Sequence, residues 1–317
     1  MVEPPDLRRV PQGPTPPPEE PRRPSGAVLA RRRLIAAALI VAMVGVGVWA
    51  ATAAIRKTKK DAPPPTTTAA IVPPKTFRVI FPEGFTRAEM AARITAVDAI
   101  ARRRRGFDPA ITAPDYLAAT ASSKLPGQFA GDRKHRDLEG FLFPAAYDLF
   151  QDDLARVLVR KQLAAFQAGW KLVKLRYARS KNLTAYDVLI IASMIEKEAV
   201  VERERPLVAA VIYNRLHARM PLAIDATIRY GLHVPGTKAL TQAELKNPTP
   251  YNTRVHTGLP PTPIANPGLP SMLAAAHPAK VDYLYFVAKP DKKHHFFTAS
   301  ATAFEQYLAA HGYGPHP

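Results

Sequence analysis

The first hydrophobic pattern along the chain is a long apolar run at residues 34–55. This run holds no charged side chain and is dominated by Ala, Val, Ile and Leu. As a helix it would extend ~33 Å, enough for a hydrocarbon core of roughly 30 Å. The small residues 51–53 are compatible with signal-peptide cleavage, but the run is longer and starts later than in a typical signal peptide. The pattern therefore favours one membrane-spanning helix over 34–55.

A second pattern, at residues 76–126, predicts a small βα unit. Phe77, Val79 and Phe81 alternate with polar positions, which is typical of a half-buried strand. Thr86 and Glu89 have the spacing of a capping box, so a helix is expected to begin there. Nothing in this unit by itself indicates a ligand.

The rest of the chain, residues 127–317, combines helices with strands. Apolar spacing predicts a helix from Leu154 to about residue 177, and a buried one that begins at Thr184. Residues 251–270 are rich in Pro, Gly and Asn and predict an ordered loop. Residues 283–288 and 294–298 are predicted strands, followed by a final helix from about Ser300. The predicted fold class is α+β.

Composition and charge narrow the class of protein. Pro-rich stretches mark residues 1–33 as a tail and residues 56–75 as a linker. The net charge of +18 favours a polyanionic neighbour, such as nucleic acid, anionic lipid or an acidic wall polymer. The sequence has no phosphate-binding glycine loop, and its aromatic residues do not alternate with basic ones. The pattern therefore does not favour a nucleic-acid-binding protein. There is no cysteine and no His-Glu-x-x-His pair, so we predict no metal and no other cofactor.

Two acids follow the predicted buried helix directly, Glu196 and Glu198. Carboxylates rarely stand beside an apolar segment without a partner or a purpose. One interpretation pairs them with nearby basic residues in a structural role. The other makes one of them a general acid, because apolar surroundings raise the pKa of a carboxyl group and keep it protonated. Hydrophobic periodicity does not separate the two acids.

Other polar positions have both a structural and a functional interpretation. Asn214 and Arg215 could form the polar edge of an ordinary helix. Asp225 could be a second carboxylate or the N-cap of the next helix, and N-cap is the commoner role.

Taken together, seven blocks resemble the MltG family (YceG-like) of endolytic murein transglycosylases, in the family's order, over roughly residues 76–310. The blocks are residues 138–144 (LEGFLFP), 192–198 (ASMIEKE), 204–216 (ERPLVAAVIYNRL), 251–253 (YNT), 258–268 (GLPPTPIANPG), 283–288 (YLYFVA) and 295–298 (HFFT).

The resemblance implies a domain organisation and a location. Residues 1–33 would be a cytoplasmic tail, 34–55 the span in the lipid bilayer, 76–126 a LysM-like subdomain and 127–317 the catalytic domain. The charges that flank the apolar run are nearly balanced, so it is the resemblance that places the catalytic domain outside the cytoplasm. Expected partners are peptidoglycan glycan strands and peptidoglycan synthases.

The resemblance also implies the residues of the site. It identifies the first acid of the EKE block, Glu196, as the catalytic residue, with Glu198 as its structural neighbour. Protonated Glu196 would cleave the bond between N-acetylmuramic acid and N-acetylglucosamine, and its carboxylate would then deprotonate the muramyl 6-hydroxyl to give a 1,6-anhydro end. The implied substrate-binding residues are Asn214, Arg215, Asp225, Tyr251, Asn252, Thr253 and His295.

The chain departs from the family pattern around these residues. Alanines stand where the family has polar residues or proline, and arginine stands where it has tyrosine. The departures are Ala145, Ala146, Ala223, Ala226 and Arg254. The rival hypothesis is a non-catalytic, membrane-anchored protein that binds peptidoglycan or a synthesis partner; a substituted glutamate would be its signature, and Glu196 is intact.

Overall fold

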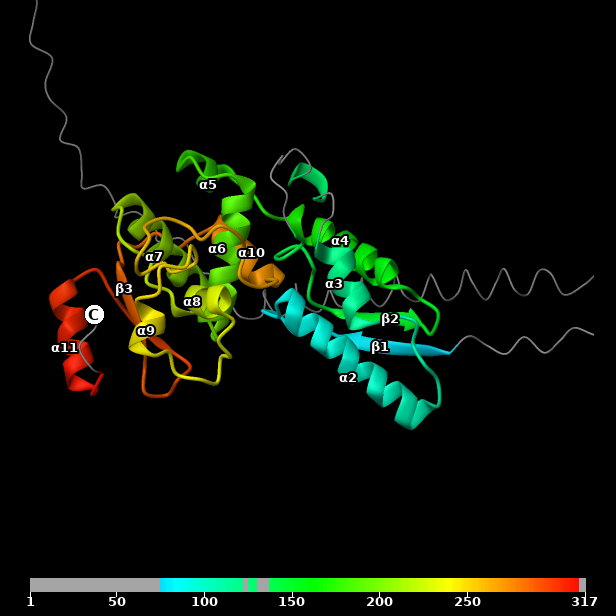
Figure 1. The fold of residues 1–317 in the computed structure, drawn as a ribbon. Helices are drawn as coiled ribbons and strands as arrows, with labels where there is room; N and C mark the ends of the chain where they lie inside the picture. The colour runs from blue at the N-terminus through cyan, green and yellow to red at the C-terminus, as the bar shows by residue number, and fades with distance from the viewer. Residues whose placement is uncertain (1–74, 122–124, 130–136, 314–317) are drawn as a thin grey trace, which may run out of the picture. The chain divides into compact units, whose positions relative to one another are not determined.

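The computed structural model describes residues 75–121, 125–129 and 137–313 (Figure 1). By internal contacts the chain divides into Met1–Val72 and Pro73–Pro317, and all described residues belong to the second unit. The predicted tail, the predicted span over 34–55 and nearly all of the predicted linker lie outside the described residues. Among the described helices, none has both the length and the apolar character needed to cross a membrane.

The predicted strand forms, as β1 (Thr76–Ile80), and its alternation sets which side chains are buried. Phe77 and Val79 face the core, while their neighbours in the strand are exposed. β1 pairs antiparallel with β2 (Ala146–Phe150), so the predicted boundary at residue 126 separates two strands that are hydrogen-bonded to each other. The βα unit predicted over residues 76–126 did not include β2, because strand pairing can join segments that are far apart in the sequence.

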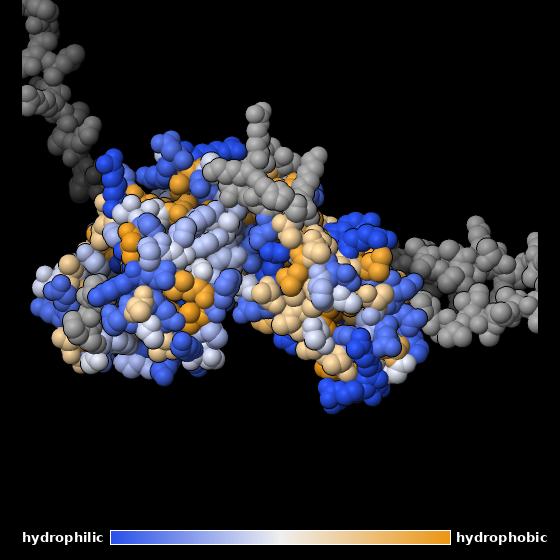
Figure 2. Space-filling view, viewed as in Figure 1, coloured by the Kyte–Doolittle hydropathy of each residue, from blue (hydrophilic) through white to orange (hydrophobic). Residues whose placement is uncertain are grey.

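Three helices accompany this two-stranded sheet (Figure 1). α2 (Arg87–Arg105) begins with the predicted capping box, in which Thr86 and Glu89 bond each other's main-chain N–H groups. α3 (Ala113–Ala121) packs between α2 and α4 (Ala155–Trp170). The arginines of the last turn of α2 are exposed, and Figure 2 shows that end of the helix as a hydrophilic surface.

The remaining described elements are mostly short helices around α6 (Ala185–Glu198). α6 begins with the second predicted capping box, at Thr184, and nearly all of its side chains from Val188 to Ile195 are buried. It packs against α7 (Arg205–His217), α8 (Asp225–Leu232) and α10 (Leu269–Ala276). The other elements are η1 (Gly127–Phe129), α5 (Arg176–Ser180), η2 (Glu202–Glu204), α9 (Gln242–Leu245), β3 (Tyr285–Ala288), β4 (His295–Thr298) and α11 (Ala301–Ala310).

β3 and β4 form a second antiparallel pair, with Tyr285 opposite Thr298 and Ala288 opposite His295. The predicted strands near residues 283–288 and 294–298, and the predicted final helix, are confirmed. Helices and two separate two-stranded sheets make up the described part of the chain, which confirms the predicted α+β class.

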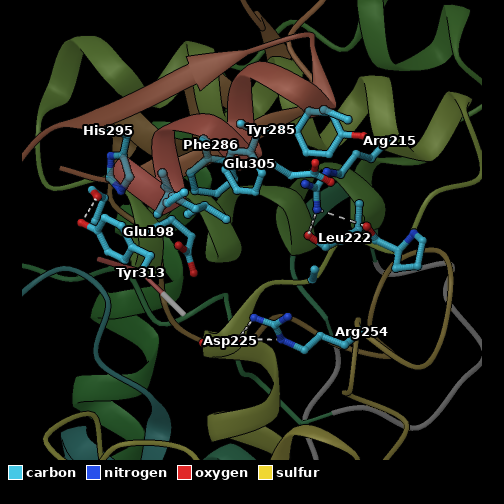
Figure 3. A pocket seen from close by; sticks show the side chains of 18 residues that line it. Glu198, Arg215, Leu222, Asp225, Arg254, Tyr285, Phe286, His295, Glu305 and Tyr313 are labelled. Atoms are coloured by element: carbon cyan, nitrogen blue, oxygen red, sulfur yellow. Dashed lines mark hydrogen bonds and ion pairs between the residues drawn. The ribbon is translucent and has the colours of Figure 1, made fainter. Parts of the chain in front are cut away.

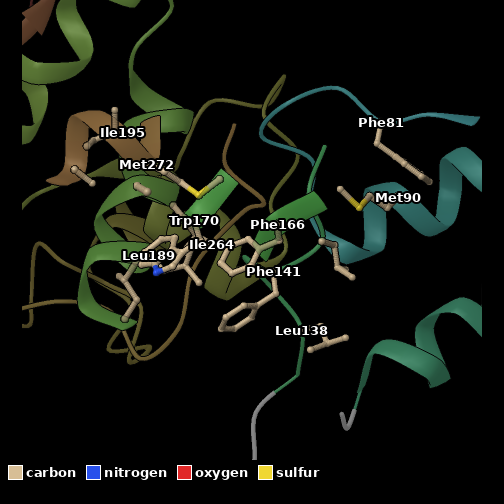
Figure 4. Close-up of a cluster of buried hydrophobic side chains, with 14 of the residues drawn as sticks. Phe81, Met90, Leu138, Phe141, Phe166, Trp170, Leu189, Ile195, Ile264 and Met272 are labelled. Carbon is tan, nitrogen blue, oxygen red and sulfur yellow. The ribbon is translucent and has the colours of Figure 1, made fainter. Parts of the chain in front are cut away.

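One hydrophobic core connects α4 with α6 and α10 (Figure 4). Phe141 meets Phe166 edge to face at a centroid distance of 5.1 Å, and Trp170 stacks on Phe166 at 5.5 Å. Leu189 and Met272 are fully buried on the α6 side of the same cluster. This packing fixes α6 rigidly, and with it the acids at its C-terminal end.

Candidate active site

A cavity of about 850 Å³ lies at the C-terminal end of α6 (Figure 3). Side chains from α6, α7, α8 and the loop after residue 250 form a polar wall, and β3 and α11 form a largely apolar one. The polar side chains that line it are Glu198, Arg215, Asp225, Arg254, His295 and Glu305, and the apolar wall includes Tyr285, Phe286, Val287, Phe304 and Leu308.

Glu196 and Glu198 occupy different sides of α6, because two residues along an α-helix lie about 200° apart around its axis. Glu196 faces α10 and the loop around Gly84, whereas Glu198 faces the cavity. The packing of the helix thus separates two acids that have equivalent hydrophobic neighbours in the sequence.

Glu196 is enclosed and its carboxylate is engaged by two donors. The main-chain N–H of Gly268 donates to Oε2 at 2.9 Å, and Arg205 donates from Nη2 to Oε1 at 3.3 Å. Its side chain is 5% exposed and is absent from the cavity lining. A Cβ atom on Gly268 would overlap the carboxyl group of Glu83, so a larger residue there would displace the Glu83 side chain. Glu196 therefore ties α6 to the start of α10.

Glu198 stands in the cavity wall with its carboxyl group directed into the space (Figure 3). No residue in the described ranges forms a hydrogen bond or ion pair with that group. The pKa of Glu198 is raised from its ordinary 4.5 to about 7, mainly by burial and also by the Asp225 carboxylate, while Arg254 opposes the shift. A carboxyl group with such a pKa keeps a proton near neutral pH, as a general acid must. Of the two acids, Glu198 lines this cavity, whereas the predicted catalytic residue Glu196 does not.

Glu139 is another acid with a raised pKa, about 8 because of burial, but it is not part of the cavity. Its carboxyl group accepts hydrogen bonds from the Arg87 main-chain N–H, from Asn266 and from the Tyr230 hydroxyl. With each oxygen engaged inside the protein, Glu139 has a structural role.

Asp225 is the first residue of α8 and faces Glu198 across the cavity, while the N-cap position belongs to Ile224. Arg254 donates from Nε to Oδ1 of Asp225 at 3.0 Å, and its Nη2 forms an ion pair with the same oxygen at 2.8 Å. Asp225 therefore adds a second carboxylate to the lining of the cavity. The arginine at position 254, a departure from the family pattern, supplies its counter-charge.

We expect Asp225→Asn to shift the pH dependence of any reaction that needs protonated Glu198. Loss of the Asp225 charge and release of Arg254 both lower the pKa of Glu198. The wild type should lose activity as the pH rises through about 7, and Asp225→Asn should lose it at a lower pH. Rates measured from pH 5 to 9 would show this shift. Glu305→Gln is the matched control, because Glu305 lines the same cavity but is not among the charges that shift this pKa. If Asp225→Asn lost activity at the same alkaline pH as the wild type, the proposed effect of Asp225 on the pKa of Glu198 would be contradicted.

A model of the YceG-like family matches residues 49–310. This chain belongs to the YceG-like family. It is 39% identical over 157 residues to an endolytic murein transglycosylase of Bacillus subtilis, a match that covers 48% of this chain and 42% of the relative. It is 29% identical over 259 residues to an endolytic murein transglycosylase of Streptococcus pneumoniae, covering 75% of this chain and 45% of the relative. The chain thus spans less than half the length of these curated relatives.

A solved structure shares the fold of this YceG-like chain. The crystal structure of a yceG-like protein from Listeria monocytogenes, at 2.6 Å, superposes with a TM-score of 0.60 and is 27% identical in sequence. The superposition covers 73% of this chain and 75% of that chain. The mixed α+β architecture is therefore that of the YceG-like family.

Two further predicted site residues of the YceG-like chain line the cavity, Arg215 and His295. Arg215 donates from Nε to the Leu284 carbonyl at 2.6 Å and from Nη1 to the Leu222 carbonyl at 2.8 Å, and burial lowers its pKa. Its guanidinium also lies over the Tyr285 ring. Arg215 consequently both braces β3 and contributes positive charge to the cavity.

The four other predicted substrate-binding residues form hydrogen bonds within the protein, and none lines this cavity. Asn214 donates to the carbonyl groups of residues 281 and 283, and Asn252 donates to those of residues 245 and 247. Thr253 accepts from the Ile224 main-chain N–H, and the Tyr251 hydroxyl lies 2.8 Å from that of Thr262. These polar side chains hold loops in place, a use that the sequence alone does not distinguish from ligand binding.

Sequence reasoning missed several residues of the polar and aromatic walls. Glu204, which contacts His295 of the cavity wall, lies within a family block but had no predicted role, and the aromatic residues of β3 were predicted only to form a strand. Among the described residues, no group of three or more His, Asp or Glu side chains is arranged to hold a metal ion. The charged side chains that line the cavity carry carboxyl and guanidinium groups, and His295 adds an imidazole.

Proposed function

We propose that the chain is an endolytic lytic transglycosylase of peptidoglycan whose general acid is Glu198. The observation that carries the proposal is an unpaired carboxyl group in a cavity wall, with a pKa raised to about 7, within the described part of the chain. The names of the relatives, endolytic murein transglycosylases, supply the substrate class.

In the proposed reaction, protonated Glu198 donates its proton to the oxygen that joins C1 of N-acetylmuramic acid to N-acetylglucosamine. The C1–O bond breaks through an oxocarbenium-like transition state. The Glu198 carboxylate then takes the proton of the muramyl 6-hydroxyl as O6 bonds to C1. A 1,6-anhydro end forms, water is not consumed, and Glu198 is protonated again.

A single acid suffices for this chemistry, and the state of Asp225 supports that choice. A hydrolytic glycosidase needs a second carboxylate as base or nucleophile. Asp225 faces the cavity, but one of its oxygens is engaged by Arg254 through a hydrogen bond from Nε and an ion pair with Nη2. In our proposal Asp225 keeps the pKa of Glu198 high, and the aromatic side chains of β3 pack against the sugar rings.

We also propose the cellular setting implied by the sequence. Residues 34–55 would anchor the chain in the cell membrane with the N-terminus in the cytoplasm, so that the catalytic domain lies outside it. The unit that contains β1 and α2 would act as a LysM-like subdomain. Nascent glycan strands and peptidoglycan synthases would be its partners, and cleavage would limit strand length.

The test is digestion of purified sacculi with the full-length chain in detergent, followed by mass spectrometry of the soluble fragments. We expect fragments with 1,6-anhydro-N-acetylmuramic acid ends and masses of internal strand segments. Fragments with reducing ends would replace the transglycosylase mechanism by hydrolysis. Binding to sacculi without fragments would favour the non-catalytic, peptidoglycan-binding alternative.

A further inference from the structure

Glu204 is a buried acid that the proposed reaction does not use. It ends η2, immediately before α7, and its carboxyl group reaches the first residue of β4, His295. Both side chains are 8% exposed. A buried carboxylate needs a partner, and here the partner is a histidine that lines the cavity.

The two contacts between these residues fix the protonation of the imidazole ring. Oε1 of Glu204 accepts from the His295 main-chain N–H at 3.2 Å, and Oε2 lies 2.7 Å from Nδ1. An ionised carboxylate only accepts hydrogen bonds, so Nδ1 must carry a proton. In the neutral ring the lone pair then belongs to Nε2. Packing against Phe286 and Phe297 holds the plane of the ring.

We propose that Glu204 is a positioning residue that holds His295 in the Nδ1-protonated tautomer, so that Nε2 accepts a hydrogen bond from a sugar hydroxyl in the cavity. The role in catalysis rests on the proposed function, whereas the tautomer does not. His295 lines the same cavity as Glu198, so both side chains border the space that a ligand would occupy (Figure 3).

The geometry makes Glu204→Gln a specific test of the His295 tautomer. A glutamine side chain has one oxygen and one NH₂ group in place of the two carboxylate oxygens. The main-chain N–H of His295 can only donate, so the glutamine oxygen must face it. The NH₂ group then faces Nδ1, which becomes an acceptor, and the ring proton moves to Nε2. Glu204→Gln thus reverses the tautomer while it preserves the shape of the side chain.

The first measurement is the tautomer of His295 by ¹⁵N NMR of the full-length chain in detergent, with its signals assigned by comparison with His295→Gln. We expect the Nδ1-protonated form in the wild type and the Nε2-protonated form in Glu204→Gln. Glu202→Gln is the matched control, since Glu202 is an exposed acid in the same turn and should leave the tautomer unchanged. An unchanged tautomer in Glu204→Gln overturns the proposal.

The second measurement is the rate of anhydro-end formation on soluble glycan strands. Glu204→Gln should lower kcat on the order of 10- to 100-fold, the range expected for one misdirected hydrogen bond. Once His295→Gln is present, Glu204→Gln should cause no further loss. Equal losses with and without His295 would show that Glu204 does not act through the ring. A wild type that forms no anhydro ends would overturn the proposed function but leave the tautomer result standing.

Discussion

Glu198→Gln is expected to reduce the rate of anhydro-end formation by about 10²- to 10⁴-fold, the usual contribution of a general acid. Glutamine has nearly the shape of glutamate but has no acidic proton for the glycosidic oxygen. Since no hydrogen bond or ion pair within the described residues depends on the Glu198 carboxyl group, the fold should be retained. The measurement is the initial rate of anhydro-muropeptide release from sacculi, with circular dichroism as the check on folding.

Glu196→Gln is the matched control, two residues earlier on the same helix. It keeps an oxygen for the Gly268 N–H but removes the negative charge beside Arg205. We expect about 1–3 kcal/mol less stability, because the Arg205 guanidinium loses the nearer of its two carboxylate partners and keeps only Glu83 at 3.9 Å. Activity should stay close to that of the wild type. If Glu196→Gln were folded but inactive while Glu198→Gln stayed active, Glu196 rather than Glu198 would be the catalytic residue.

Asn266→Ala is expected to cause the largest loss of stability, about 4 kcal/mol, because it leaves several buried groups without partners. Asn266 is fully buried, and its oxygen accepts from the main-chain N–H groups of Gly140 and Leu142 at 2.9 Å each. Its amide group donates to the Phe85 carbonyl and to Glu139. One side chain therefore joins the loop before α2, the loop before β2 and the loop before α10.

The change in stability would be measured from thermal and urea unfolding. Asn247→Ala is the comparison variant, because within the described residues that side chain accepts one hydrogen bond, from the Thr249 main-chain N–H, and it lies in a partly exposed loop. Its cost should stay near 1 kcal/mol or below. Similar unfolding midpoints for the two variants would mean that Asn266 does not hold the three loops together.

Local signals in the sequence predicted local structure well. Both capping boxes, at Thr86 and Thr184, depend only on residues three positions apart, and both form. The alternation of Phe77, Val79 and Phe81 likewise determined the buried face of β1. The partner of β1 was not predicted, because pairing with β2 brings together residues about 70 positions apart, which no local pattern encodes.

Polar residues were harder to interpret, because ligand binding and loop stabilisation use the same side chains. Asn252 and Thr253 were predicted to bind substrate, yet their amide and hydroxyl groups satisfy main-chain groups of neighbouring loops. Arg254, the next residue, reaches the cavity through its longer side chain and pairs with Asp225. Which of three successive residues faces the site depends on how the loop is folded.

By itself, the sequence determined that a buried helix ends in two acids, and its blocks determined the YceG-like family. Only the tertiary structure decided that Glu198 faces a cavity and Glu196 does not. The two acids have equivalent apolar neighbours along the helix, so the hydrophobic pattern treats them alike. Their surroundings differ because α10 covers one side of the helix, whereas α8, β3 and α11 enclose a cavity on the other, and folding brings these elements together from distant parts of the chain.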